Sequence, residues 1–171
     1  MKNSIIFERR SVRAYDSSRK ASKEQLEDIL DAAMHAPSAM NKQPWHFVVA
    51  TTEESVKKIM QIHPYCESLA DAGTAIIVCG NTETQFKTPD GEYWMYDCSA
   101  ATQNILLRAK ELGLDTCWCG IYPEKQRTEA FQKLFGLSSE IIPMALVILG
   151  YGAESPTLEE KRYDPKKVLF A

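Results

Sequence analysis

Apolar residues recur along the chain with two periods, one typical of helices and one typical of strands. Behind a Ser22–Gln25 capping box, Leu26, Ile29 and Ala33 lie at helical spacing. Residues 45–51 alternate and are rich in Val and Phe, which predicts a strand. Further strands are predicted over residues 74–79, 116–121 and 143–151. Further helices are predicted around Val56 and Ile59, over residues 93–112, and from Pro123 to residue 135.

Helices and strands therefore interleave, as in a mixed α/β domain. The 171 residues suit one domain with a sizeable core. We treat residues 1–171 as that single domain and residues 152–171 as a C-terminal arm. Because the arm is long and ends in the apolar run Val168-Leu169-Phe170, we expect it to dock on another surface.

Charge and hydropathy exclude several classes of protein. The net charge is −3 and the pI is about 5.7, which argues against a nucleic-acid-binding protein. No apolar run reaches the ~18 residues that span a bilayer, so no membrane partner is expected. The first apolar stretch is too short for a signal peptide and is interrupted by Glu8. We therefore expect a cytoplasmic protein.

Cysteine and histidine indicate neither a disulfide framework nor a metal site. There are five cysteines, an odd number. Cys117-Trp118-Cys119 has no second Cys/His pair at ligand spacing, and we expect its two thiols to point to opposite faces of an extended segment. The three histidines, His35, His46 and His63, form no constellation and are read as structural or surface residues.

Four sets of residues carry candidate chemistry, and each also has a simpler interpretation. Arg9-Arg10-Ser11-Val12-Arg13 is either an anion cradle or a solvated helix end with surface ion pairs. Pro37-Ser38-Ala39-Met40-Asn41 is either a helix stop or a loop presenting amides to a planar ligand, helped by Gln43. Lys161-Arg162 is either tail charge or a second phosphate clamp. Phe86, Tyr93 and Trp94 either belong to the core or line a pocket beside the polar segment 81–91.

The order of these segments resembles the FMN-dependent nitroreductase family, in a compact member. The resemblance extends along almost the whole chain and rests on residues 9–15, 36–45, 97–104, 113–120 and 150–152. It implies an α+β fold with a central mixed, mostly antiparallel sheet flanked by helices. It also implies a homodimer with a domain-swapped C-terminal tail and FMN sites at the interface.

The resemblance implies a role for each candidate residue. Arg9, Ser11 and Arg162 would hold the FMN phosphate and ribityl chain, with Arg10 and Lys161 beside them. Arg13 would face the flavin N1/O2 edge, and the Cys119-Gly120 backbone would approach N5. The ring would be covered from the other subunit by a set of loop residues: Pro37, Ser38, Ala39, Asn41 and Gln43. Phe86, Tyr93 and Trp94 would line the substrate pocket.

The implied activity is hydride transfer from NAD(P)H through FMN to a nitroaromatic, quinone or related small acceptor, in a ping-pong cycle. No catalytic side chain is needed, although Arg13 would tune the flavin. Two alternatives stay open. One is a flavin carrier or redox sensor without turnover, and the other is a related reductase acting on alkenes or halogenated aromatics.

Overall fold

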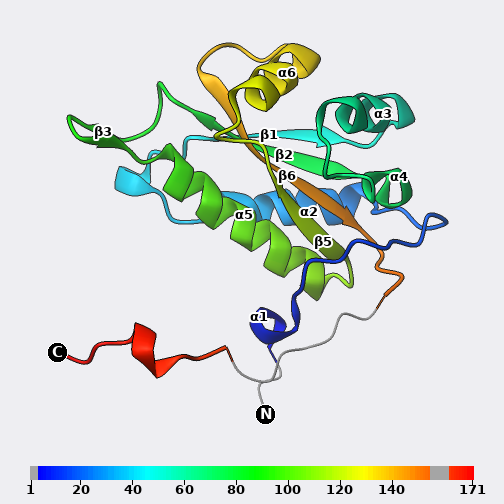
Figure 1. Cartoon of the computed structure of the whole chain (residues 1–171), viewed down its shortest axis with the longest axis horizontal. Coiled ribbons are helices and arrows are strands. Elements are labelled where there is room, and N and C mark those ends of the chain that lie inside the picture. The colour runs from blue at the N-terminus through cyan, green and yellow to red at the C-terminus, as the bar shows by residue number, and fades with distance from the viewer. Residues whose placement is uncertain (1–3, 155–161) are drawn as a thin grey trace.

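The computed structural model describes residues 4–154 and 162–171, and its centre is a four-stranded sheet (Figure 1). The strands are β1 (Trp45–Ala50), β2 (Ala75–Asn81), β5 (Asp115–Gly120) and β6 (Ile141–Gly150), in the order β1-β2-β6-β5. All neighbouring strands are antiparallel. The parallel component of the expected mixed sheet is one isolated bridge between Ser11 and Thr116, beside the edge strand β5.

Helices cover both faces of the sheet (Figure 1). One layer contains α2 (Lys23–Met34) and α5 (Trp94–Glu111), and the other contains α3 (Glu53–Ile62), α4 (Leu69–Ala72) and α6 (Lys125–Phe135). Short elements complete the chain: α1 (Ile5–Glu8), η1 (Ala39–Asn41), the hairpin of β3 (Lys87–Thr88) and β4 (Gly91–Glu92), and η2 (Pro165–Lys167).

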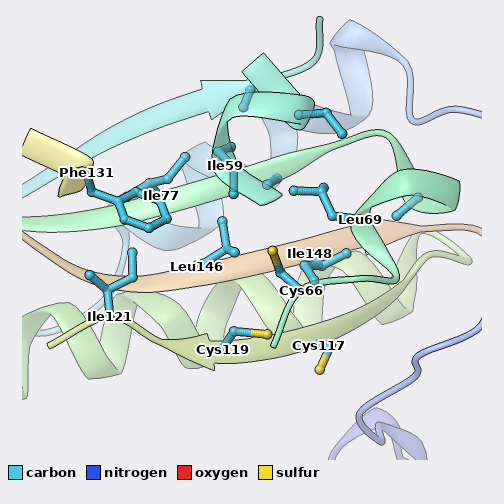
Figure 2. Packing of buried hydrophobic residues seen from close by; sticks show 14 of the residues in the cluster. Ile59, Cys66, Leu69, Ile77, Cys117, Cys119, Ile121, Phe131, Leu146 and Ile148 are labelled. Atoms are coloured by element: carbon cyan, nitrogen blue, oxygen red, sulfur yellow. The ribbon is translucent and has the colours of Figure 1, made fainter. Parts of the chain in front are cut away.

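The central strands supply side chains to two cores, one on each face. In β2, Ile76 and Val78 pack toward α2 and α5, whereas Ile77 packs toward the opposite layer. Figure 2 shows Ile77 with Phe131 in this second core. Burial on both faces explains why the strand over residues 74–79 reads as an uninterrupted apolar run.

Most predicted elements are present, with three differences. Pro123 was expected in the first turn of a helix, but α6 begins at Lys125 and the cis Tyr122–Pro123 bond lies in the preceding turn. Strand β6 begins before Pro143, which the sheet tolerates because the β2–β6 register shifts there. The segment 81–91, expected to be a polar loop, contains the β3–β4 hairpin.

The C-terminal residues 162–171 extend away from the body (Figure 1). Leu169 and Phe170 are 90% and 88% exposed. In the described part of the chain, no helix has the length and apolar character to cross a membrane.

Candidate functional site

Three guanidiniums from the two ends of the chain converge beside α1. Arg9 is half-buried, and its pKa is lowered by burial and by the positive charges of Arg10 and Arg162. Like charges held together in a partly buried place favour a bound anion, because an anion offsets both the repulsion and the lost hydration. Arg9 and Arg162, both predicted to hold the FMN phosphate, thus lie close enough for their charges to interact, while Lys161 lies outside the described residues.

The side chain of Arg10 is hydrogen-bonded to the backbone. Its Nη1 donates to the carbonyl oxygens of Phe7 (2.9 Å) and Arg9 (2.7 Å) at the end of α1. Its Nε is buried without a hydrogen-bond partner among the described residues. Arg10 therefore shapes the turn that presents Arg9 and adds positive charge.

The segment after Arg10 is extended and fixed to the sheet edge. The Val12 N–H donates to the Thr116 oxygen (3.0 Å), and the Arg13 N–H donates to Oε1 of Glu154 (3.0 Å). Val12 is fully buried, whereas Ser11 and Arg13 are exposed. Alternation along this segment therefore puts Ser11 and Arg13 on the same outer side.

Arg13 borders a cavity of about 330 Å³. The opposite wall comes from residues 64–68, between α3 and α4, and includes Tyr65, Glu67 and Ser68. Sequence reasoning missed this wall, because residues 64–68 lie about fifty positions from Arg13 and carry no motif.

Cys117 also lines this cavity, and its neighbour Cys119 shares its side of β5. The expectation that the two thiols point to opposite faces is wrong, because residues i and i+2 of a strand lie on one face. Figure 2 shows both side chains with Cys66 at the edge of the core. The neighbouring Cys119 thiol and the charge of Arg13 lower the pKa of Cys117, although burial opposes this.

The loop from Pro37 to Gln43 is held in an unusual backbone conformation. Met40, Asn41 and Gln43 have φ angles of 51°, 54° and 48°. Non-glycine residues avoid this left-handed region, so the surrounding contacts must hold the loop. Ser38 Oγ accepts from the Gln43 N–H (2.9 Å), and Gln43 Nε2 donates to Asn41 Oδ1 (3.0 Å). The side chains of Asn41 and Gln43 therefore each use one amide group for a hydrogen bond within the loop.

Asp97, in the first turn of α5, anchors this loop. Its Oδ1 accepts from the Ala39 N–H at 2.9 Å. Asp97 begins the stretch 97–104 that carries the resemblance, but sequence reasoning assigned it no role in the site. A sequence signal was present, since Asp97 shares the apolar stripe of Trp94 and Ala101 at positions i, i+3 and i+7.

The loop and the arginine cluster lie at opposite ends of α5 within one protomer. The loop is tied to the first turn of the helix by Asp97, and the arginine segment is tied to Thr116, just beyond its last turn. An 18-residue helix is roughly 27 Å long. One chain alone therefore does not bring both sets of residues to the same small ligand.

The predicted contact at Cys119-Gly120 lies at the outer edge of the sheet. Gly120 is exposed, but its carbonyl oxygen accepts from Arg127 Nη1 (2.6 Å) and lies 3.1 Å from His63 Nε2. These contacts fix the strand end beside residues 64–68. The Gly120 carbonyl oxygen therefore already has hydrogen-bonding neighbours within the protein.

Of the three aromatic candidates, Trp94 belongs to the core. It is 2% exposed and lies edge-on to Tyr122, with 5.2 Å between ring centroids. Its ring packs against Gly80 of β2, which favours the core interpretation, and Trp94 also lines a cavity with Tyr122. Tyr93 remains exposed and contacts Phe86, with 5.2 Å between their ring centroids.

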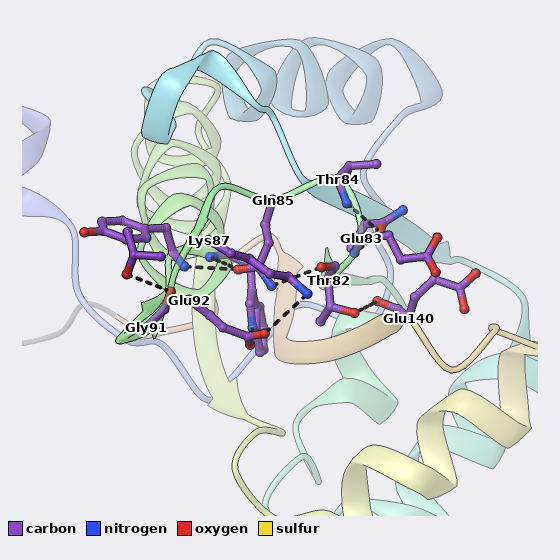
Figure 3. A network of polar contacts seen from close by, with 12 residues as sticks. Thr82, Glu83, Thr84, Gln85, Lys87, Gly91, Glu92 and Glu140 are labelled. Carbon is purple, nitrogen blue, oxygen red and sulfur yellow. Dashed lines mark hydrogen bonds and ion pairs between the residues drawn. The ribbon is translucent and has the colours of Figure 1, made fainter.

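A polar network holds the segment that carries these aromatics (Figure 3). Gln85 is buried, and its Oε1 accepts from the N–H groups of Tyr93 (3.0 Å) and Trp94 (3.1 Å). Its Nε2 donates to the Thr82 oxygen at 3.2 Å. Gln85 therefore satisfies the first donors of α5 and fixes the hairpin to the helix.

Comparison with known proteins identifies the group to which this architecture belongs. The sequence model of the nitroreductase family matches residues 6–63 and 61–151 of this chain. The chain belongs to the nitroreductase family. A protein of Methanothermobacter thermautotrophicus, provisionally named NADH dehydrogenase/NAD(P)H nitroreductase, is 42% identical over 163 residues, which cover 95% of this chain and 83% of that protein.

Solved structures of nitroreductases share the fold. A crystal structure of a similarly named protein from Bacteroides thetaiotaomicron VPI-5482 has a TM-score of 0.88 and 38% identity, covering 97% of this chain and 94% of that one. An FMN-dependent nitroreductase from Clostridium difficile R20291 has a TM-score of 0.86 and 27% identity, covering 98% and 97%. The predicted α+β nitroreductase-like fold is confirmed.

Proposed function

We propose that this nitroreductase-family chain is an FMN-dependent oxidoreductase that uses NAD(P)H to reduce a nitroaromatic, quinone or related small acceptor in a ping-pong cycle. The observation that best supports this proposal is the cluster of positive charges formed by Arg9, Arg10 and Arg162. Such a cluster suits a phosphate monoester, which is dianionic near neutral pH. Bound FMN would supply the hydride chemistry, for which no side chain of the protein is required.

The residues beside the cluster suit the rest of the cofactor. Ser11 and Arg13 follow Arg9 on the exposed side of one extended segment, so a ligand anchored at Arg9 extends toward the Arg13 cavity. A fixed guanidinium beside the ring edge stabilises negative charge there with little reorganisation. This is the role we assign to Arg13.

We further propose that two chains complete each site in a homodimer. The support is the separation of the arginine cluster from the Pro37–Gln43 loop along α5. A second support is the exposed apolar surface at both ends of the chain, on Ile6 and Phe7 of α1 and on Leu169 and Phe170 of the arm. In this arrangement the loop of one subunit covers the ring held by the other and excludes water.

The cofactor proposal is tested by the absorbance spectrum of the purified protein after addition of FMN and removal of the excess. We expect flavin bands at nearly one FMN per subunit. We expect Arg9→Ala to lose them, whereas Lys133→Ala, an exposed cation on α6, retains them. Absence of stoichiometric flavin in the unmodified protein would contradict the proposal.

A second measurement separates an enzyme from a flavin carrier. We expect NAD(P)H oxidation by the FMN-loaded protein to accelerate when a quinone or nitroaromatic is added. A protein that binds FMN but shows no such acceleration would be a carrier or sensor instead.

A further inference from the structure

His63 is a buried histidine with a hydrogen bond at each ring nitrogen. It caps the C-terminal end of α3 and is only 2% exposed. Its ring lies edge-on to Tyr65 and to Phe131, with 6.2 Å between ring centroids in both pairs. The proposed function gives this residue no role, although it directly precedes Pro64 in the wall of the Arg13 cavity.

The hydrogen bonds of the ring determine where its proton lies. The Tyr65 N–H can only donate, and it lies 3.2 Å from Nδ1, so Nδ1 is the acceptor. The proton is therefore on Nε2, which donates to the Gly120 carbonyl oxygen at 3.1 Å. Burial, followed by the charge of Arg127, lowers the pKa of His63, although the hydrogen bond to Gly120 opposes this. The ring is therefore neutral near neutral pH.

These two hydrogen bonds join segments that both belong to the Arg13 cavity. Tyr65 lies in one wall, whereas Gly120 ends β5, the strand that supplies Cys117 to the same cavity. Because one rigid ring connects the two backbones, their separation is fixed by the ring. His63 lies behind the wall and acts on the cavity through Tyr65 and Gly120.

The neighbouring contacts between the same segments are weaker. Cys119 Sγ donates to the Tyr65 carbonyl oxygen at 3.4 Å, but a thiol is a poor donor. Arg127 donates to the Gly120 oxygen and lies 5.8 Å from the centroid of the Tyr65 ring. That ring is 75% exposed, so the cation–π contact contributes little. The buried histidine is therefore the stronger link.

We propose that His63 is a positioning residue of the Arg13 cavity, whose neutral ring holds residues 64–68 against β5 and keeps water away from Arg13. The link to catalysis rests on the proposed function, in which the edge of the flavin ring lies beside Arg13. A guanidinium acts more strongly on the flavin when water is excluded, because the local dielectric constant is then low. Releasing the wall weakens the effect of Arg13 without removing its charge.

Three substitutions separate the two hydrogen bonds from the shape of the ring. His63→Phe keeps an aromatic ring in the same packing and removes both hydrogen bonds. His63→Asn keeps an acceptor near the position of Nδ1, and His63→Gln keeps a donor near the position of Nε2. The matched control is His35→Phe, at the exposed C-terminal cap of α2.

The first measurement needs no flavin. Cys117 lines the cavity but is only 3% exposed, so its alkylation by iodoacetamide requires the wall to move. We expect His63→Phe to accelerate this alkylation at least about fivefold, which is about 1 kcal/mol, and His35→Phe to leave it unchanged. His63→Asn and His63→Gln should give intermediate rates. An unchanged rate in His63→Phe, or an equal acceleration at the fully buried Cys79, would overturn the proposal.

Long-range proton–nitrogen NMR correlation of the unmodified protein tests the ring itself and depends on no variant. We expect His63 to carry its proton on Nε2 near neutral pH, with the signal assigned by its loss in the variants. A ring protonated on Nδ1, or on both nitrogens, would contradict the proposed link, because Nδ1 could then not accept from Tyr65.

The flavin measurement is a double-mutant cycle on the midpoint potential of bound FMN. His63→Phe should lower the potential in the same direction as Arg13→Ala, and the double variant should match Arg13→Ala alone, since no charge then remains to be screened. Additive shifts, or no shift in His63→Phe, would refute a role exerted through Arg13. Alkylation and NMR do not require FMN, so a failure of the flavin assignment is distinguishable from a failure of the His63 link.

Discussion

Arg9 and Arg13 are four residues apart, yet the structure gives them different surroundings. Arg9 sits among other guanidiniums, whereas Arg13 borders a cavity that also contains the Cys117 thiol. We expect Arg9→Ala to weaken FMN binding roughly 10- to 150-fold, since a charge-assisted hydrogen bond contributes about 1.5–3 kcal/mol. The potential of flavin that remains bound should be nearly unchanged, because the phosphate is not reduced.

Arg13→Ala should instead lower the flavin midpoint potential, because it removes positive charge from the edge where reduction places negative charge. Arg13→Lys should recover part of the shift, since lysine keeps the charge but not the planar fork. Spectroelectrochemical titration with excess FMN measures both variants. Equal potentials for Arg13→Ala and the unmodified protein would show that Arg13 does not face the ring.

The five thiols should differ sharply in reactivity. The neighbouring Cys119 thiol and the charge of Arg13 lower the pKa of Cys117, whereas burial raises the pKa of Cys79 and Cys98 to about 12. The pKa of Cys119 is raised by the neighbouring Cys117 thiol and by burial. Because the thiolate is the nucleophile, Cys117 should be alkylated first by iodoacetamide, and its rate should rise at a lower pH than that of the other thiols.

Mass spectrometry of the alkylated peptides locates the label and follows its rate. Arg13→Ala should move the Cys117 profile to higher pH, because the thiolate then loses its positive neighbour. Added FMN should slow the labelling if the flavin covers the cavity. Preferential labelling of Cys79 or Cys98 would contradict the assignment.

At the scale of elements, the contact between β2 and the start of α5 depends on Gly80. A Cβ atom at this position would overlap the six-membered ring of Trp94, which is buried and cannot move aside. We therefore expect Gly80→Ala to destabilise the protein by about 1–3 kcal/mol, which lowers Tm by roughly 2–12 °C. Thermal unfolding monitored by circular dichroism measures the change.

Gly120→Ala is the matched control, since Gly120 also lies in a strand and a Cβ there meets only a backbone oxygen at 3.9 Å. Its Tm should change little. If both variants unfold at the same temperature, Trp94 is free to move and the assignment of its ring to the core is wrong.

At the scale of the whole molecule, the C-terminal arm is expected to hold the dimer together. Truncation after Asp164 removes the exposed apolar residues Val168, Leu169 and Phe170. We expect it to weaken dimerisation and FMN retention together, because each site takes residues from both chains. Analytical ultracentrifugation and flavin absorbance are measured on the same sample. A truncated monomer that still binds FMN tightly would refute the shared site.

A mixed dimer provides a stricter test of the same arrangement. Arg9→Ala damages the phosphate cluster, and Asn41→Arg is designed to block the loop, so neither homodimer should retain FMN. A dimer with one subunit of each kind has one site with both lesions and one with neither. We expect purified mixed dimers to bind one FMN with nearly normal affinity. No recovery would indicate that cluster and loop do not serve the same site.

The elements that the sequence predicted well are those in which burial and periodicity coincide. The capping box at Ser22 is present, and the apolar run over residues 74–79 became the central strand β2. The predicted boundaries of α6 and β6 differ from the observed ones, because each was set from a proline and its immediate neighbours in the sequence. Pro123 was placed in a helix and Pro143 at a strand end, because chain order alone does not reveal a turn or a shift of register.

The sequence by itself determined the family, the arginine motif and the loop motif, because each is a short run of residue types with its own chemistry. Only the tertiary structure decided that Arg162 lies near Arg9, that residues 64–68 line the Arg13 cavity, and that Asp97 accepts a hydrogen bond from the loop. These contacts join residues that are far apart along the chain. No local pattern specifies them, because they exist only after the sheet and its two helical layers have packed.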